Sequence, residues 1–457
     1  MQDIIFLSAN YLIIILMSIY TIKCFTVFRH SDAVKQNRIF VQQNILMFII
    51  HFIAYAILFL KNPDEKLLLY YGMQFVLILF ILLMYNAVYP ESSRLIINNM
   101  CMLIIIGCIY ISSINSALII RHFIFIFAGI LVSVFIPFII KKINGLRNIW
   151  YIYAFIGIAV LLTMRLFSKS LGAHIEVKLL GISMQPQEFI KILYVFMIAA
   201  IYDRGVEVKR VILCGILSAA HVLILVWNND LGVALILAFV YVVMTFIATK
   251  NSLYFISGVI GAGVSFGIGY KLFTHVQNRV AIWLDPWQDY LGVGYQIVMA
   301  LFAIANGGWF GVGLGNGQAK TIPIVTSDLM IIPIIEESGL IFAIFLILVC
   351  VSCFVMFLNI SSVLDDMFYK LLALGLGATY IVQVLLTVGG SVKFIPMTGV
   401  TLPLISYGGS SMLATIIAFS IIQGLYVIYG IKRRDISKHR RLYEKRKSEK
   451  KPKKQYR

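Results

Sequence analysis

Long apolar segments recur along the whole chain and are separated by short polar stretches. Each is about as long as the roughly 20 residues that a helix needs to cross a bilayer. We expect thirteen membrane spans, near residues 4–22, 39–60, 67–89, 99–115, 121–140, 149–166, 186–203, 209–227, 231–248, 253–273, 330–358, 366–390 and 402–430. The pattern therefore predicts an all-α polytopic membrane protein.

The composition favours the same class of protein. Hydrophobic residues make up 61% of the chain and charged residues only 13%, whereas a soluble domain has about 25% charged residues. All six cysteines lie in or beside apolar spans, including the closely spaced Cys350 and Cys353. A redox or metal pair needs a polar, accessible setting, so we interpret these cysteines as small buried apolar residues.

Positive charge is concentrated at the C-terminus. Between Lys432 and Arg457 there are fourteen lysines and arginines and three acidic residues. Such a tail is predicted to be disordered and to lie on anionic lipid headgroups at the cytoplasmic face. Nucleic acid is not an expected partner, because no folded module or interleaved aromatic residues accompany the charge. An outer N-terminus and a cytoplasmic C-terminus place most loop lysines and arginines in the cytoplasm.

This topology leaves two long loops outside the cytoplasm, from Arg165 to Gln187 and over residues 274–329. Loops of this length in a compact protein are usually functional. The second is rich in Gly, Trp, Asp and Arg, so the chemistry is expected there. Its glycine run, Gly311–Gly317, has no strand–turn–helix context and is not interpreted as a dinucleotide site.

Several ionisable residues lie at or near apolar spans, where a charge costs several kcal/mol and normally faces a polar cavity. Glu188 and Lys191 are three residues apart, so they share a helix face and can pair. The others are Asp230, at a very short turn, Glu336 and Glu337, early in a span, and Lys393, in a short outer connection. The alternative for each is a satisfied pair or cap that only locks helices together.

Eight motifs follow one another in a fixed order: Gln185–Lys191, Asp230–Gly232, Asn278–Trp287, Gly294–Ile297, Gly307–Lys320, Thr326–Asp328, Glu336–Gly339 and Pro396–Ser411. Together they resemble the SEDS family (shape, elongation, division and sporulation), which includes RodA, FtsW and SpoVE. The last motif, with its Ser-Tyr-Gly-Gly-Ser-Ser ending, is the most specific. The resemblance covers residues 97–435.

The resemblance implies a ten-span catalytic core over residues 97–435, with the large outer loop 274–329. Residues 1–96 would add about three spans, and residues 436–457 would form the basic cytoplasmic tail. It also implies a glycosyltransferase of the bacterial cytoplasmic membrane that polymerises lipid II into peptidoglycan strands beside a class B penicillin-binding protein. A lipid II flippase and a non-catalytic cell-wall scaffold are the alternatives.

The acid that the resemblance marks as essential is Asp328. Polymerisation requires a sugar hydroxyl to attack an anomeric carbon while undecaprenyl diphosphate leaves, and a positioned carboxylate can take the hydroxyl proton. Asp328 is therefore our candidate general base, and a helix cap for the next span is its alternative role.

The remaining candidates would bind the substrate, and the cations among them would compensate the diphosphate charge. The substrate-binding candidates are Glu188, Lys191, Asp230, Arg279, Lys320, Lys393, Glu336, Ser406 and Tyr407. No cofactor is assigned, although the oxygen-rich pair Asp285 and Asp289 could hold a divalent cation, Mg²⁺ or Mn²⁺.

Overall fold

The computed structural model describes residues 2–30, 32–142, 144–167, 177–179 and 182–449. Over these ranges the chain is mainly helical, and every expected span coincides with a helix. Ten segments are long and apolar enough to cross a membrane, and one of them, Arg94–Lys142, contains two helices. The other two predicted spans form the shorter helices α6 (Trp150–Phe167) and α7 (Gln187–Asp203). The predicted all-α membrane architecture is confirmed.

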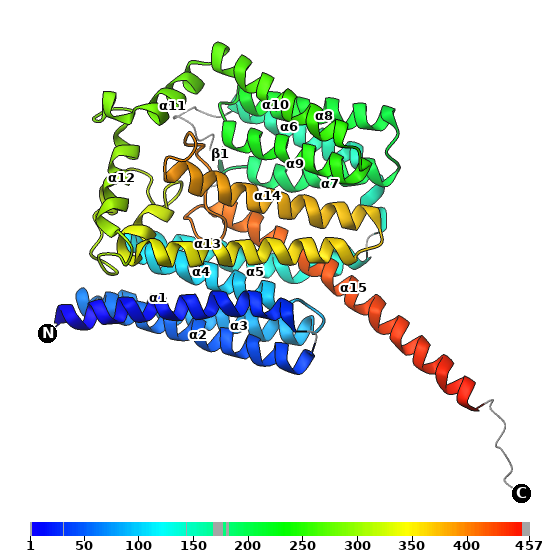
Figure 1. Ribbon diagram of the computed structural model, residues 1–457, viewed down its shortest axis with the longest axis horizontal. Coiled ribbons are helices and arrows are strands. Elements are labelled where there is room, and N and C mark those ends of the chain that lie inside the picture. Colours follow the sequence, from blue (N-terminus) through cyan, green and yellow to red (C-terminus); the bar gives the residue numbers. More distant parts are fainter. Residues whose placement is uncertain (1, 31, 143, 168–176, 180–181, 450–457) are drawn as a thin grey trace, which may run out of the picture.

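Three N-terminal helices lie side by side along one edge of the molecule, coloured blue in Figure 1. They are α1 (Gln2–Thr26), α2 (Ala33–Lys61) and α3 (Glu65–Val88). The side chains of Asp32 and Asp64 cap α2 and α3 by accepting backbone N–H groups of the first helical turn. We call this group the N-terminal unit. It packs against the rest of the bundle through α1 on α13 and α2 on α4.

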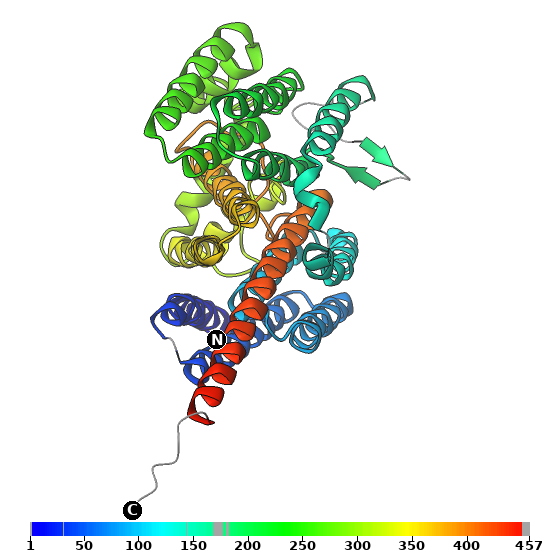
Figure 2. The same cartoon turned by 90° about the vertical axis from the view of Figure 1, so that its right-hand side faces the viewer.

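The remaining long helices form the main bundle, in which α14 packs against α7, α9 and α13. Figure 2 looks at the same bundle from its right-hand side. Their bounds are α4 (Arg94–Asn115), α5 (Ile119–Lys142), α8 (Val208–Trp227), α9 (Leu231–Thr249), α10 (Ser252–Leu272), α13 (Ile331–Val363), α14 (Met367–Ser391) and α15 (Gly409–Glu449). Short 3₁₀ helices lie at Val27–Arg29 (η1), Ser116–Leu118 (η2) and Asn144–Asn148 (η3).

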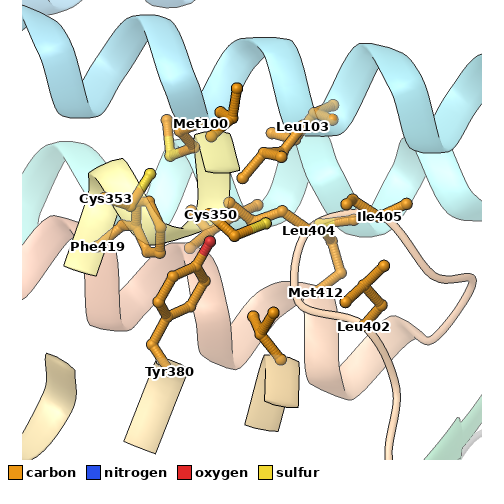
Figure 3. Packing of buried hydrophobic residues seen from close by; sticks show 14 of the residues in the cluster. Met100, Leu103, Cys350, Cys353, Tyr380, Leu402, Leu404, Ile405, Met412 and Phe419 are labelled. Atoms are coloured by element: carbon orange, nitrogen blue, oxygen red, sulfur yellow. The ribbon is translucent and has the colours of Figure 1, made fainter. Parts of the chain in front are cut away.

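The interior between α4, α13, α14 and α15 is apolar (Figure 3). Cys350 and Cys353 lie in this core beside the ring of Phe419 and are fully buried. All six cysteines are free and buried, so the interpretation of this pair as small apolar side chains is confirmed. Leu402 and Ile405 pack into the same core from the non-helical chain between α14 and α15.

The expected outer loop 274–329 is partly helical, which the sequence analysis did not predict. It contains α11 (Thr274–Leu284), η4 (Pro286–Asp289), α12 (Tyr295–Gly307) and η5 (Ala319–Thr321). Apolar residues of α12 at helical spacing, including Ile297, Ala300 and Ala303, are buried, and α12 packs against α13. This burial supplies the stability that a short amphipathic helix lacks in isolation.

The final span starts later than predicted, at Gly409 and not near residue 402. Pro403 and Leu404, the latter with a positive φ of 65°, interrupt a helix there. At its other end α15 continues to Glu449, so the prediction that the basic tail is disordered is wrong up to that residue. Lys, Arg and Glu are good helix formers, and neither Gly nor Pro occurs between Ile431 and Glu449. Residues 450–457 lie outside the described residues.

The expected loop from Arg165 to Gln187 contains a short antiparallel hairpin. Strand β1 (Val177–Leu179) pairs with β2 (Ile182–Met184). The expectation for residues 168–176 and 180–181 lies outside the described residues.

Because successive spans alternate in direction, several functional segments meet at one end of the bundle, on the left in Figure 1. They are the start of α7, the α8–α9 turn, α11, the start of α13 and residues 392–408. We call this the active end.

Candidate active site

The segment of residues 392–408, between α14 and α15, runs through the centre of the active end. Two side chains of α14 donate hydrogen bonds to its backbone carbonyls. Thr387 Oγ1 donates to the Val400 carbonyl at 3.1 Å, and Gln383 Nε2 donates to the Thr401 carbonyl at 2.9 Å. Buried backbone carbonyls need such partners, so α14 fixes the path of this non-helical chain.

Asp328 and Arg279 meet at one glycine of this segment. A Cβ placed on Gly399 would lie 3.6 Å from Oδ2 of Asp328 and 3.7 Å from Nη2 of Arg279. Arg279 comes from α11 and is anchored by a 2.9 Å hydrogen bond from Nη1 to the Met397 carbonyl. The φ angle of Gly399 is +73°, which favours glycine. Three separate parts of the chain thus bring an acidic and a basic side chain to one glycine.

Asp230 joins this group through the close approach of the α8–α9 turn. A Cβ on Gly232 would lie 2.7 Å from the Thr398 carbonyl oxygen and 2.5 Å from Val400, so only glycine permits this packing. The side chain of Asp230 caps α9, with Oδ1 accepting the Val233 N–H at 3.1 Å. The turn therefore carries a carboxylate to the neighbourhood of Arg279.

Glu188 and Lys191 form the pair that their spacing predicted. Lys191 Nζ donates to Glu188 Oε2 at 2.8 Å and to Gln383 Oε1 at 2.5 Å. Both charged side chains are buried, where an ion pair needs additional hydrogen bonds to offset its desolvation. Gln383 supplies one of them and connects the pair to the Thr401 carbonyl of the central segment.

Electrostatics couple these acids and bases. Burial raises the pKa of Asp230 to about 6, with a smaller contribution from Glu188, while its hydrogen bond with Val233 opposes the shift. Burial lowers the pKa of the Arg279 guanidinium, and the carboxylates of Asp230 and Asp328 oppose that effect. The group therefore holds ionisable side chains of both signs within mutual influence, an arrangement typical of functional sites.

Comparison with known proteins identifies the family of this chain. The model of the cell cycle protein family of FtsW, RodA and SpoVE matches residues 92–427. The chain belongs to this family. The resemblance carried by its sequence motifs is thereby confirmed, and with it the character of a multi-pass membrane protein.

Two curated relatives extend the comparison. The peptidoglycan glycosyltransferase RodA of Mycobacterium tuberculosis is 35% identical over 303 residues, covering 62% of this chain and 65% of that protein. The probable peptidoglycan glycosyltransferase FtsW of Aliivibrio salmonicida is 33% identical over 324 residues, covering 66% and 78%. The chain thus spans just under two thirds of the length of the mycobacterial RodA that it matches.

A solved structure shares the fold. It comes from work on the structural coordination of polymerization and crosslinking by a peptidoglycan synthase complex. It superposes with a TM-score of 0.63 at 19% identity, covering 74% of this chain and 98% of the other. At this level of identity the likeness shows a common fold of the FtsW/RodA/SpoVE core.

Asp328 lies at the end of the expected outer loop, but its side chain is buried. It lies just before α13 and is only 5% exposed, because the 392–408 segment folds over it. Ser391 Oγ donates to its backbone carbonyl at 3.2 Å. The N-cap residue of α13 is Met330, which makes no side-chain cap, so the alternative role of Asp328 as the N-cap of this helix is wrong.

Three other candidates belong to the framework of this site. Ser406 Oγ donates to the Ser327 carbonyl at 2.5 Å and the Tyr407 N–H donates to the Thr326 carbonyl at 2.8 Å. Both contacts hold the residues that precede Asp328. The carbonyl of Lys393 accepts the indole N–H of Trp283 at 3.2 Å, which ties α11 to the end of α14.

Two candidates lie in other surroundings. Both carboxylate oxygens of Glu336 hold the outer loop: Oε1 accepts from Asn306 Nδ2 at 2.9 Å and Oε2 from the Ala319 N–H at 2.7 Å. Lys320 follows in η5 and lines a cavity against the N-terminal unit. These two residues therefore do not join the group around Gly399.

The proposed cation ligands act as local caps. Asp285 Oδ1 accepts the Trp287 N–H at 3.1 Å, and Asp289 Oδ2 accepts the Val293 N–H at 3.0 Å. Among the described residues there is no group of three or more His, Cys, Asp or Glu side chains that could hold a metal ion. A requirement for Mg²⁺ or Mn²⁺ stays a prediction.

One residue of this site, Gln383, was not predicted from the sequence. It is a buried amide in the middle of an apolar span, and an intramembrane polar side chain is itself a signal of function. Gly399 belongs to the motif Pro396–Ser411, but its approach to Asp328 and Arg279 could not be predicted from that motif.

Proposed function

We propose that this protein is a peptidoglycan glycosyltransferase that polymerises lipid II at the outer face of the bacterial cytoplasmic membrane. Membership of the FtsW/RodA/SpoVE family and relatives named as peptidoglycan glycosyltransferases support this activity. The observation that carries the proposal is the convergence of Asp328 and Arg279 at Gly399. A carboxylate beside a guanidinium can both take a proton and bind a phosphate.

In the proposed reaction, Asp328 is the general base. Its carboxylate takes the proton from the acceptor sugar hydroxyl as that oxygen bonds to the anomeric carbon of the donor. The bond between this carbon and the diphosphate oxygen breaks at the same time, and undecaprenyl diphosphate leaves with the electron pair. Arg279 offers planar, paired N–H donors to the developing negative charge.

The neighbouring charges would bind and orient the substrate. Lys191, held by Glu188 and Gln383, adds a buried positive charge, and Asp230 adds a second carboxylate beside Arg279. Lys393 lies in the same segment as Gly399 and is a further candidate for phosphate binding. We propose that Ser406 and Tyr407 keep the Thr326–Asp328 stretch in place.

The topology and partners belong to the same proposal. An outer N-terminus and a cytoplasmic C-terminus would place Asp328 outside the cytoplasm. Residues 97–435 would form the catalytic core, residues 1–96 an added membrane segment and residues 436–457 the basic cytoplasmic tail. The solved synthase complex that shares this fold couples polymerization to crosslinking, which supports a class B penicillin-binding protein as partner.

The deciding experiment adds lipid II to the purified full chain, alone and with its transpeptidase partner, and separates the glycan products by length. Wild type should form strands and Asp328→Asn should not, while both proteins run as the same monodisperse species. Lipid II translocation in vesicles without strand formation would instead indicate a flippase. Rescue of a null strain by Asp328→Asn would indicate a scaffold.

A further inference from the structure

A large polar cavity lies between the N-terminal unit and the main bundle. Its volume is about 820 Å³, within the roughly 300–1,000 Å³ typical of small-molecule sites. The walls come from the first residues of α1, the α2–α3 connection, the end of α4 and the loop of residues 312–320. Ser113 at the end of α4 donates a hydrogen bond to Glu337 at the start of α13, so the cavity lies at the same end of the bundle as Asp328.

The outer loop is held against the N-terminal unit. Lys61, the last residue of α2, donates from Nζ to the Leu314 carbonyl at 2.5 Å and to Asn316 Oδ1 at 2.8 Å. Asn316 Nδ2 in turn donates to the Val312 carbonyl at 2.9 Å. The polar wall on this side is therefore fixed in position before any ligand arrives, which lowers the entropic cost of binding.

The opposite wall is also fixed by hydrogen bonds. Ser112 Oγ is 2.8 Å from the hydroxyl of Tyr55 on α2, and Ser113 Oγ donates to both carboxylate oxygens of Glu337 at 3.0 Å. Ser116 lines the same side. Hydroxyl groups at the end of α4 thus face amide and ammonium groups on the loop and on α2.

We propose that this cavity is an accessory site for the carboxylate-bearing saccharide–peptide portion of a glycan substrate or product. Serine hydroxyls and asparagine amides both donate and accept hydrogen bonds, which suits sugar hydroxyls and peptide amides. Lys320 is exposed on the cavity and makes no ion pair within the described ranges of the chain. Its ammonium is placed to bind a peptide carboxylate.

This assignment rests on the proposed function, because it takes its ligand from the polymerisation reaction. It adds a role for the N-terminal unit, without which one side of the cavity would be missing. The loop that forms the other side leads through η5 to Asp328, so glycan held here stays attached to the active end between additions.

The test measures binding of a soluble disaccharide–pentapeptide, which lacks the lipid, to the purified full chain by calorimetry. Lys320→Gln removes the cation and should weaken binding about ten-fold, the typical value of one charge-assisted hydrogen bond. Ser116→Trp places an indole in the cavity beside the end of α4 and should weaken binding more strongly. Lys66→Gln is the matched control, because Lys66 is an exposed lysine of the same end that does not line the cavity.

The outcomes separate this inference from the proposed reaction. Asp328→Asn should bind the soluble probe as wild type does, even with polymerisation lost. Equal affinity of wild type, Lys320→Gln and Ser116→Trp would overturn the site while leaving the polymerase proposal intact. Binding of short-chain phosphatidylglycerol that is lost in Ser116→Trp, with no measurable binding of the disaccharide–pentapeptide to wild type, would assign the cavity to a lipid headgroup and also overturn the inference.

Discussion

Two groups of acidic residues lie at the active end, and their surroundings differ. Glu336 and Glu337, at the start of α13, accept hydrogen bonds from the loop backbone and from neutral side chains, namely Ala319 N–H, Asn306 and Ser113. Asp328 and Asp230 instead lie near Arg279, and Asp328 and Arg279 approach the same glycine, Gly399. The first group has neutral partners that fold the loop, and the second lies beside a cationic side chain.

We propose that this difference separates residues of the framework from residues of the chemistry. A carboxylate whose oxygens are occupied by fixed N–H donors cannot readily accept a further proton from a substrate. A carboxylate that shares a glycine with a guanidinium can act on a ligand that enters beside the glycine. Two carboxylates only eight residues apart in the chain, Asp328 and Glu336, therefore have different surroundings, and we expect them to have different roles. Four predictions test this contrast.

The largest effect is expected from Asp328→Asn. Loss of the general base should lower the rate of lipid II polymerisation by about 10²–10⁴-fold, with the melting temperature in detergent little changed. Single-turnover assays with labelled lipid II measure the rate. A variant within three-fold of wild type would remove Asp328 from the chemistry.

Arg279→Lys should have the next largest effect. Lysine keeps the positive charge but loses the planar pair of donors, so we expect a drop of about 10–100-fold, mainly in kcat. This drop would support a bidentate contact between Arg279 and the diphosphate. Activity of Arg279→Lys equal to that of wild type would instead leave Arg279 only the role of an anchor for the Met397 carbonyl.

Glu336→Leu tests the framework group. It leaves the buried Ala319 N–H without an acceptor, which costs about 1–3 kcal/mol of folding free energy. Thermal unfolding should therefore occur at lower temperature, and Glu336→Gln, which keeps one acceptor oxygen, should recover most of the loss. A rate loss as large as that of Asp328→Asn, with unchanged stability, would place Glu336 in the chemistry instead.

Asp230→Asn should give the smallest effect, and its sign depends on pH. Because burial raises the folded pKa of Asp230 to about 6 from 3.8, its stabilising contribution is complete below about pH 4 and is lost as the pH rises through 6. The asparagine variant, which cannot ionise, should be more stable than wild type by about 1 kcal/mol at pH 7. Unfolding temperatures measured from pH 4 to 8 should converge at the acidic end.

The sequence by itself determined the membrane architecture and the family. Apolar runs long enough to cross a bilayer located the spans, because every backbone polar group in lipid must be satisfied within a helix. The i, i+3 spacing of Glu188 and Lys191 predicted their ion pair, since helix geometry alone brings such residues together. The ordered motifs gave the family.

Only the tertiary structure decided which acids share a site. Asp230, Arg279 and Asp328 are separated by long stretches of chain, and their meeting depends on the path of the 392–408 segment past Gly232 and Gly399. It also distinguished Glu336, whose oxygens are taken by the loop, from Asp328. Periodicity and composition report on local structure, whereas a site built from non-helical backbone is set by packing between distant segments.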